Sequence, residues 1–167
     1  MFERVLIEPQ AFADNRQVLQ GRVALKDLDG RVHSPDMADL DAQTVYSLRG
    51  GRDRQQRRFL DLTLSGLLPL YCQRCLQPVD FRLDENVRIV LFDDEAALDR
   101  AMLADEELEG MLCPSELDVT ELLEDQILMA LPFSPKHEHC GAAERSVVSD
   151  KPNPFAVLAD LKKPVAD

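Results

Sequence analysis

The 167-residue chain has no run of about eighteen consecutive apolar residues, which a membrane-spanning helix requires. Its first ten residues, MFERVLIEPQ, include two glutamates and lack the basic start and apolar stretch of a secretory signal. A phosphate-binding glycine loop is missing, as are the GxSxG and HExxH motifs of common hydrolases. We therefore expect a cytoplasmic protein that acts by binding and has no catalytic activity.

Positive charge is scarce, because 19 Lys and Arg stand against 31 Asp and Glu and give a net charge of −12. This total opposes direct binding to a polyphosphate and favours a basic protein partner. The positive charge is concentrated in RGGRDRQQRR at residues 49–58, which holds five arginines and one aspartate. Residues 93–125 hold thirteen acids and one base. The sequence thus contains two segments of opposite charge.

Alternating apolar and polar residues indicate two long strands, one starting at Phe59 and one over residues 79–92. With a shorter strand from Val45 they predict an antiparallel meander. The stretch LDVTELLEDQILMALP predicts a helix over about 118–131, capped by Asp118 and stopped by Pro132.

We therefore predict an α+β fold, in which the long helix packs across one face of a strongly curled antiparallel sheet. Shorter helices are predicted from Pro9 to about Leu19 and around EAALDRAML. The predicted domain covers residues 1–135, followed by a surface linker over 136–151 and a short helical tail over 152–167.

Four cysteines, at positions 72, 75, 113 and 140, should be reduced in the cytoplasm. Cys72 and Cys75 lie at the predicted hairpin tip, where two thiolates can reach one zinc ion. Residues 137–140 offer further ligands beyond the predicted helix. The metal hypothesis is a structural zinc site of Cys72, Cys75, Cys140 and one histidine, taken as His137 with His139 as the alternative.

The CxxC pair has two other interpretations besides zinc binding. The small cysteines can simply fill the turn, and this alternative stays open beside the metal site. A redox couple is disfavoured, because no helix is predicted to start at Cys75 and lower a thiol pKa. Cys113 has no partner pattern and is interpreted as a spare thiol.

The arginine-rich segment is the candidate RNA-binding site. Its arginines would form a basic hairpin arm able to lie along a phosphate backbone, although no interleaved aromatic residue offers base stacking. Alternatively, the segment is a solvated tip that protects a sheet edge. The residues are Arg49, Arg52, Arg54, Arg57 and Arg58.

Three acids of the predicted helix, Glu121, Glu124 and Asp125, are the candidate landing surface for a basic ribosomal or nucleic-acid-binding protein. We expect Glu124 and Asp125 on the exposed side of the helix. The alternative is an ordinary solvated face.

Three stretches, CQRCLQPVDF, DVTELLEDQILMALPFSPKHEHC and KPNPFAVLADLK, together resemble the YceD family of large ribosomal RNA subunit accumulation proteins. The resemblance covers about residues 60–167. It implies a role in making or stabilising large-subunit (23S) ribosomal RNA, and no known catalytic activity. The matching positions are Cys72, Cys75, Glu124, Asp125, Pro132, His137, Cys140, Pro152, Asn153, Pro154 and Phe155.

The resemblance and the residues together lead to an assembly-factor hypothesis. The chain would bind large-subunit ribosomal RNA or its precursor, a basic ribosomal protein, or both. Partner binding would involve the three helix acids and the tail residues Pro152, Asn153, Pro154, Phe155 and Leu158. The alternatives are a metal-dependent RNA-processing enzyme and a zinc-stabilised protein-interaction module.

Overall fold

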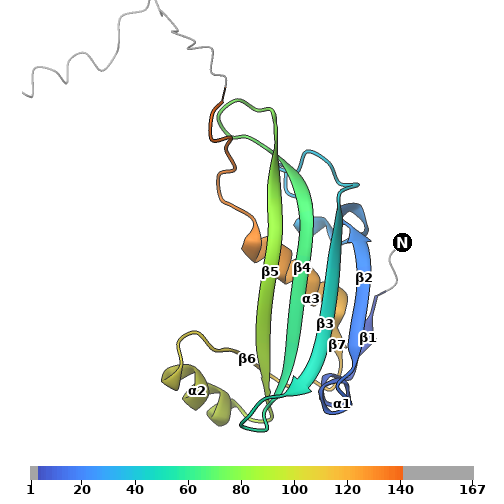
Figure 1. Cartoon of the computed structure of the whole chain (residues 1–167), viewed down its shortest axis with the longest axis vertical. Coiled ribbons are helices and arrows are strands. Elements are labelled where there is room, and N and C mark those ends of the chain that lie inside the picture. Colours follow the sequence, from blue (N-terminus) through green and yellow to red (C-terminus); the bar gives the residue numbers. More distant parts are fainter. Residues whose placement is uncertain (1–3, 141–167) are drawn as a thin grey trace, which may run out of the picture.

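The computed structural model in Figure 1 describes residues 4–140. Its main feature is a five-stranded sheet with the order β2-β3-β4-β5-β6. The strands β2 to β5 form an antiparallel meander, and β6 pairs parallel to β5. Their bounds are β2 Val18–Ala24, β3 Gln43–Arg52, β4 Arg58–Tyr71, β5 Pro78–Phe92 and β6 Glu109–Leu112.

Three α-helices and a second small sheet complete the described part of the chain. The helices are α1 (Pro9–Asp14), α2 (Glu95–Ala104) and α3 (Val119–Ala130). The strands β1 (Leu6–Ile7) and β7 (Leu117–Asp118) pair with each other, and short 3-10 turns cover Leu25–Asp27 and Gly30–Val32. No helix among residues 4–140 is long and apolar enough to cross a membrane.

The predicted α+β class and the mostly antiparallel sheet are confirmed, but the predicted strong curl is wrong. The pairing of β4 with β5 continues in unbroken register from Arg58–Leu91 to Tyr71–Pro78. Bulges are the usual cause of sharp strand bending, and this register contains none. The helix α3 spans 12 residues, so it has an ordinary length and is not especially long.

The first predicted helix also ends earlier than expected. The helix α1 stops at Asp14, because Arg16 adopts a left-handed φ of 50° and β2 starts at Val18. Gly50 lets this helix pack closely on β3: a Cβ atom at this position would lie 2.5 Å from the Phe12 carbonyl oxygen.

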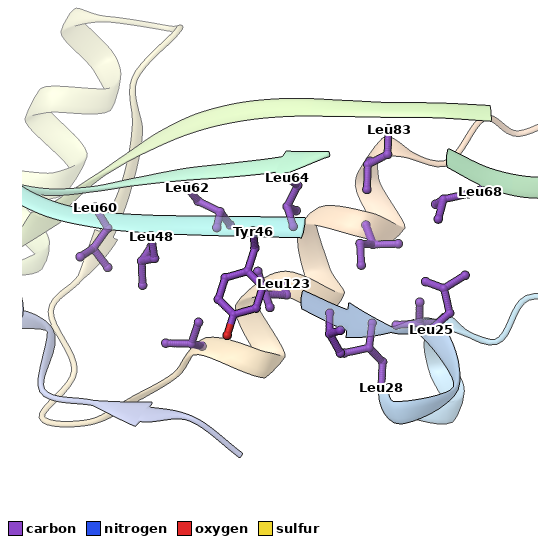
Figure 2. Close-up of a cluster of buried hydrophobic side chains, with 14 of the residues drawn as sticks. Leu25, Leu28, Tyr46, Leu48, Leu60, Leu62, Leu64, Leu68, Leu83 and Leu123 are labelled. Carbon is purple, nitrogen blue, oxygen red and sulfur yellow. The ribbon is translucent and has the colours of Figure 1, made fainter. Parts of the chain in front are cut away.

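The hydrophobic core lies between the sheet and α3 (Figure 2). The alternating leucines of β4, such as Leu60, Leu62 and Leu64, are almost fully buried. The helix contributes Val119, Leu123 and Ile127, spaced four residues apart. Asp118 caps α3 as predicted, accepting hydrogen bonds from the backbone N–H groups of Thr120 and Glu121. Packing of these side chains holds α3 against the sheet. It therefore sets the position from which residues 131–140 continue.

The opposite face of the sheet is polar at its centre. Gln20, Thr63 and Asn86 are exposed there, on strands β2, β4 and β5. In Figure 1 the helix α3 crosses behind β4 and β5, on the other side of the sheet.

Candidate metal centre and charged surfaces

Cys72 and Cys75 lie in the turn between β4 and β5, as the sequence predicted. The turn is closed by two backbone hydrogen bonds: Cys72 N–H donates to Gln77 O at 2.9 Å, and Leu76 N–H donates to Cys72 O at 2.8 Å. Leu76 has a left-handed φ of 59°, which tightens the turn. The backbone therefore holds both sulfur atoms at one tip.

The chain returns to this tip after α3. Leu131 is extended, and the segment that starts at Pro132 runs back along β5 (Figure 1). Gln73 N–H donates to Pro135 O at 2.9 Å, which joins the segment to the hairpin tip. Pro135 is itself buried. We call residues 132–140 the return segment.

The return segment places His137 and Cys140 beside Cys72 and Cys75. One ligand atom from each of the four residues lies within 4.8 Å of all the others. Cys72 Sγ is 3.5 Å from Cys140 Sγ, and Cys75 Sγ is 3.4 Å from His137 Nδ1. All four cysteines of the described chain are free thiols. Such a Cys3His cluster could hold a metal ion.

The hydrogen bonding of His137 fits a metal ligand. Its Nε2 lies 2.9 Å from Pro78 O, a contact that requires Nε2 to carry the proton. The lone pair of Nδ1 then faces Cys75 and Cys140, 3.4 and 3.9 Å away. Metal-binding histidines commonly donate their other ring N–H to a carbonyl in this way. His139 is exposed and does not belong to the cluster.

The protonation of the thiols also fits a site that takes up a cation. Burial opposes ionisation of Cys72, but hydrogen bonds from the backbone N–H groups of Cys75, His137 and Arg74 lower its pKa to about 5. Burial and the neighbouring sulfurs of Cys72 and Cys75 raise the pKa of Cys140 to about 11. A second thiolate beside Cys72 thus requires a compensating positive charge.

Cys113 is separate from the cluster. It follows β6, where its N–H donates to Phe92 O at 2.8 Å, and burial raises the pKa of its thiol. It provides a natural control cysteine for experiments on the cluster.

Four of the five arginines predicted to contact RNA form ion pairs in the β3–β4 hairpin region. Arg54 is exposed and has no ion-pair partner among residues 4–140. The pairs are Arg49–Asp61 at 2.6 Å, Arg57–Asp53 at 2.7 Å, Arg52–Asp14 at 2.7 Å and Arg58–Asp14 at 3.0 Å.

Two of these carboxylates, Asp14 and Asp61, are each shared between two arginines. Asp61 also binds Arg88 at 2.6 Å, and hydrogen bonds from Arg88 and Arg49 outweigh the effect of burial and lower its pKa. Arg58 contacts a fourth acid, Asp93, at 3.5 Å. Six arginines and four aspartates make up this set, and Asp105, Glu107 and Glu109 line the same hollow as Arg52, Arg54, Arg57 and Arg88, so neighbouring acids balance its positive charge. We call it the arginine cluster: Arg49, Arg52, Arg54, Arg57, Arg58 and Arg88 with Asp14, Asp53, Asp61 and Asp93.

The prediction that Glu124 lies on the exposed side of its helix is wrong. Its side chain is 8% exposed and pairs with Arg31 at 2.8 Å. It also accepts a hydrogen bond from Asp29 N–H at 2.9 Å. Asp125 pairs with the same arginine at 2.7 Å but is 52% exposed, and Glu121 is exposed. The landing surface predicted on this helix therefore loses one of its three acids.

The predicted tail residues, at positions 152–155 and 158, lie outside the described residues, as does the end of the predicted linker. Two exposed apolar residues were missed by the sequence analysis: Met129 is 67% exposed and Phe133 is fully exposed. A signal was present for Met129, because Glu121, Asp125 and Met129 follow one another at intervals of four along the polar side of the helix, whereas Phe133 lies beyond its end.

A family model described as "Large ribosomal RNA subunit accumulation protein YceD" matches residues 60–162. A curated protein of the same description from Haemophilus influenzae is 34% identical over 110 residues, covering 56% of this chain and 59% of that protein. The chain thus matches less than two thirds of that relative's length. No solved structure matches it.

The family match spans more than half of the chain. It includes both halves of the Cys3His cluster, the hairpin that carries the CxxC pair, and the helix α3. The chain therefore belongs to the YceD family of large ribosomal RNA subunit accumulation proteins.

Proposed function

We propose that this protein is a non-catalytic ribosome biogenesis factor that supports the synthesis, processing or stability of large-subunit (23S) ribosomal RNA. It acts by binding RNA, a basic ribosomal protein, or both. The observation that carries the proposal is the family match over residues 60–162, together with the printed description of the Haemophilus influenzae relative.

Zinc is the ion that we propose for the Cys3His cluster. Three thiolates and one imidazole are a common ligand set for structural zinc. Cys72, Cys75, His137 and Cys140 would hold it, and the ion would join the return segment to the hairpin tip. A tetrahedral ion with four protein ligands leaves no position for water or substrate, which favours a structural site over a metal-dependent RNA-processing enzyme.

Direct RNA contact is supported by the arginine cluster and the polar sheet face beside it. Arg49 and Asp61 line a hollow of about 270 Å³ on that face, together with Gln20, Thr63 and Asn86. Guanidinium, hydroxyl and amide groups can all donate hydrogen bonds to phosphate oxygens. Arg54 is exposed and has no ion-pair partner among residues 4–140, so its guanidinium group can contact a phosphate without first leaving an acid.

The test is the ratio of 23S to 16S ribosomal RNA in the organism that encodes this chain. Deleting the gene should lower the ratio, and wild-type protein should restore it. The variant Cys72→Ser/Cys75→Ser should fail to restore it, whereas Cys113→Ser should succeed because Cys113 lies outside the cluster. A ratio that stays the same with and without the gene would overturn the proposed function.

A further inference from the structure

The end of α3 presents two large apolar side chains to solvent. Met129 lies in the last turn of the helix and is 67% exposed, and Phe133 follows shortly after its end with a fully exposed ring. Four residues of chain span at most about 14 Å, so both side chains can be covered by one partner segment. We call Met129 and Phe133 the apolar pair.

Phe133 belongs to a segment that is held in place. The return segment is tied to the hairpin tip by the Gln73–Pro135 backbone hydrogen bond and by the contact of His137 with Pro78. The Cys3His cluster adds a third attachment at Cys140. An aromatic side chain on a tethered segment loses little conformational entropy when a partner covers it, as is usual for binding hot spots.

A pocket of about 290 Å³ lies beside the return segment. Val79 and Phe81 of β5 form one wall, and Pro132 and Pro135 form the other. Single exposed apolar residues are normal on protein surfaces, and Leu103 on α2, 86% exposed, is such a case. At the end of α3, in contrast, two exposed apolar side chains occur together with a tethered backbone and a pocket whose lining is partly apolar and also includes Asp80, Ser134 and Lys136.

The charges around this surface are mainly negative. Exposed Glu121 and Asp125 precede the apolar pair on α3, and Asp80 and Glu138 lie on β5 and the return segment. Two bases stand against these acids: Lys136 lines the pocket, and Arg31 pairs with Asp125 at 2.7 Å. Such a surface repels the phosphate backbone of RNA and attracts lysine and arginine side chains.

We propose that the apolar pair and its adjoining pocket are the docking site for a basic protein segment that carries an apolar anchor side chain. The anchor occupies the pocket between β5 and the return segment, beside Met129 and Phe133. Lysine or arginine residues of the partner lie along Glu121 and Asp125. This inference rests on the proposed function, from which it takes the partner class: a basic protein of the large ribosomal subunit.

The experiment uses the full-length protein and defined probes. Purified basic large-subunit ribosomal proteins are presented one at a time, and a 23S RNA transcript is the other arm. At least one of the proteins should bind, and Met129→Ser/Phe133→Ser should weaken that binding at least about tenfold. Glu121→Lys should also weaken it, with a smaller effect at higher salt. Leu103→Ser, an equally exposed apolar position on α2, is the matched control and should bind like wild type.

Three results would overturn the proposal: no basic protein binds, the Met129/Phe133 variant binds like wild type, or that variant loses affinity for the RNA transcript alone. A photo-crosslinking amino acid placed at position 133 gives a second readout that does not depend on the folding of the double variant. It should crosslink to the bound protein, whereas the same group at position 103 should not.

Failure of this inference can be distinguished from failure of the proposed function. If the Met129/Phe133 variant binds every probe like wild type and also restores the 23S to 16S ratio, the docking site is wrong and the function stands. If the ratio never depends on the gene, the function itself is wrong.

Discussion

Two neighbouring acids on α3 share one arginine but lie in different environments. Glu124 has an 8% exposed side chain and binds both Arg31 and the Asp29 N–H group, whereas Asp125 is 52% exposed and binds Arg31 alone. Removing a buried carboxylate leaves its hydrogen-bond donors without partners. When an exposed carboxylate is removed, water can take its place as the acceptor. The two positions therefore allow a matched comparison.

We expect Glu124→Ala to lower the free energy of unfolding by about 1–3 kcal/mol, because the Asp29 N–H group and Arg31 lose their buried acceptor. Asp125→Ala, on the same helix and against the same arginine, should cost less than about 1 kcal/mol. Urea denaturation at neutral pH measures both. Equal losses from the two variants would show that burial does not decide the difference.

The sequence could not have shown the burial of Glu124. Residues 93–125 contain thirteen acids and one base, so each acid there is interpreted as solvated. The partner Arg31 is 93 residues away along the chain, and no local pattern predicts a contact over that separation. By contrast, the CxxC spacing is a local pattern, and the prediction of the hairpin tip for Cys72 and Cys75 is confirmed.

At the scale of elements, the sequence predicts the long strands and misses the short ones. Both β4 and β5 alternate over 14 or 15 residues, which makes the period of two clear. The strands β1 and β7 have two residues each and β6 has four, which is too short for any periodicity. The choice of His137 over His139 likewise depends on tertiary structure, because it is decided by the carbonyl of Pro78.

The Cys3His cluster joins the β4–β5 hairpin to the return segment after α3, so loss of the zinc proposed there should free that segment. We expect one zinc per chain in protein purified without added metal, and none in Cys140→Ser. Trypsin should then cleave after the exposed Lys136 faster in Cys140→Ser, or after chelation, than in the zinc-bound protein.

Two controls make this result specific. Cys113→Ser should keep its zinc, because Cys113 is outside the cluster. Cleavage after Arg54, an exposed site in the β3–β4 hairpin, should proceed at the same rate in every variant. Purified wild-type protein that contains no metal and has free thiols at Cys72 and Cys75 would contradict the zinc assignment.

For the whole molecule, the position of each charge is more informative than the total of −12. The arginine cluster gathers positive charge that neighbouring acids offset, whereas α3 exposes Glu121 and Asp125 along its length and Met129 in its last turn. The polar sheet face and the end of α3 are on different elements, so one protein could contact RNA and a basic protein at the same time. In the proposed assembly role, the protein would hold the RNA and the basic protein together through these two surfaces.

The role of the arginine cluster in RNA binding can be tested by removing single acids. Asp14 binds both Arg52 and Arg58, so Asp14→Asn should release Arg52 for a phosphate contact and leave Arg58 with Asp93 alone. The affinity for a 23S transcript should rise, and the slope of log K against log salt should steepen by about 0.7 for each additional phosphate contact. Asp125→Asn on α3 changes the net charge by the same amount, away from the arginine cluster, and should leave the slope nearly unchanged. If the two variants shift the slope equally, RNA responds only to net charge, and the arginine cluster is not its binding site.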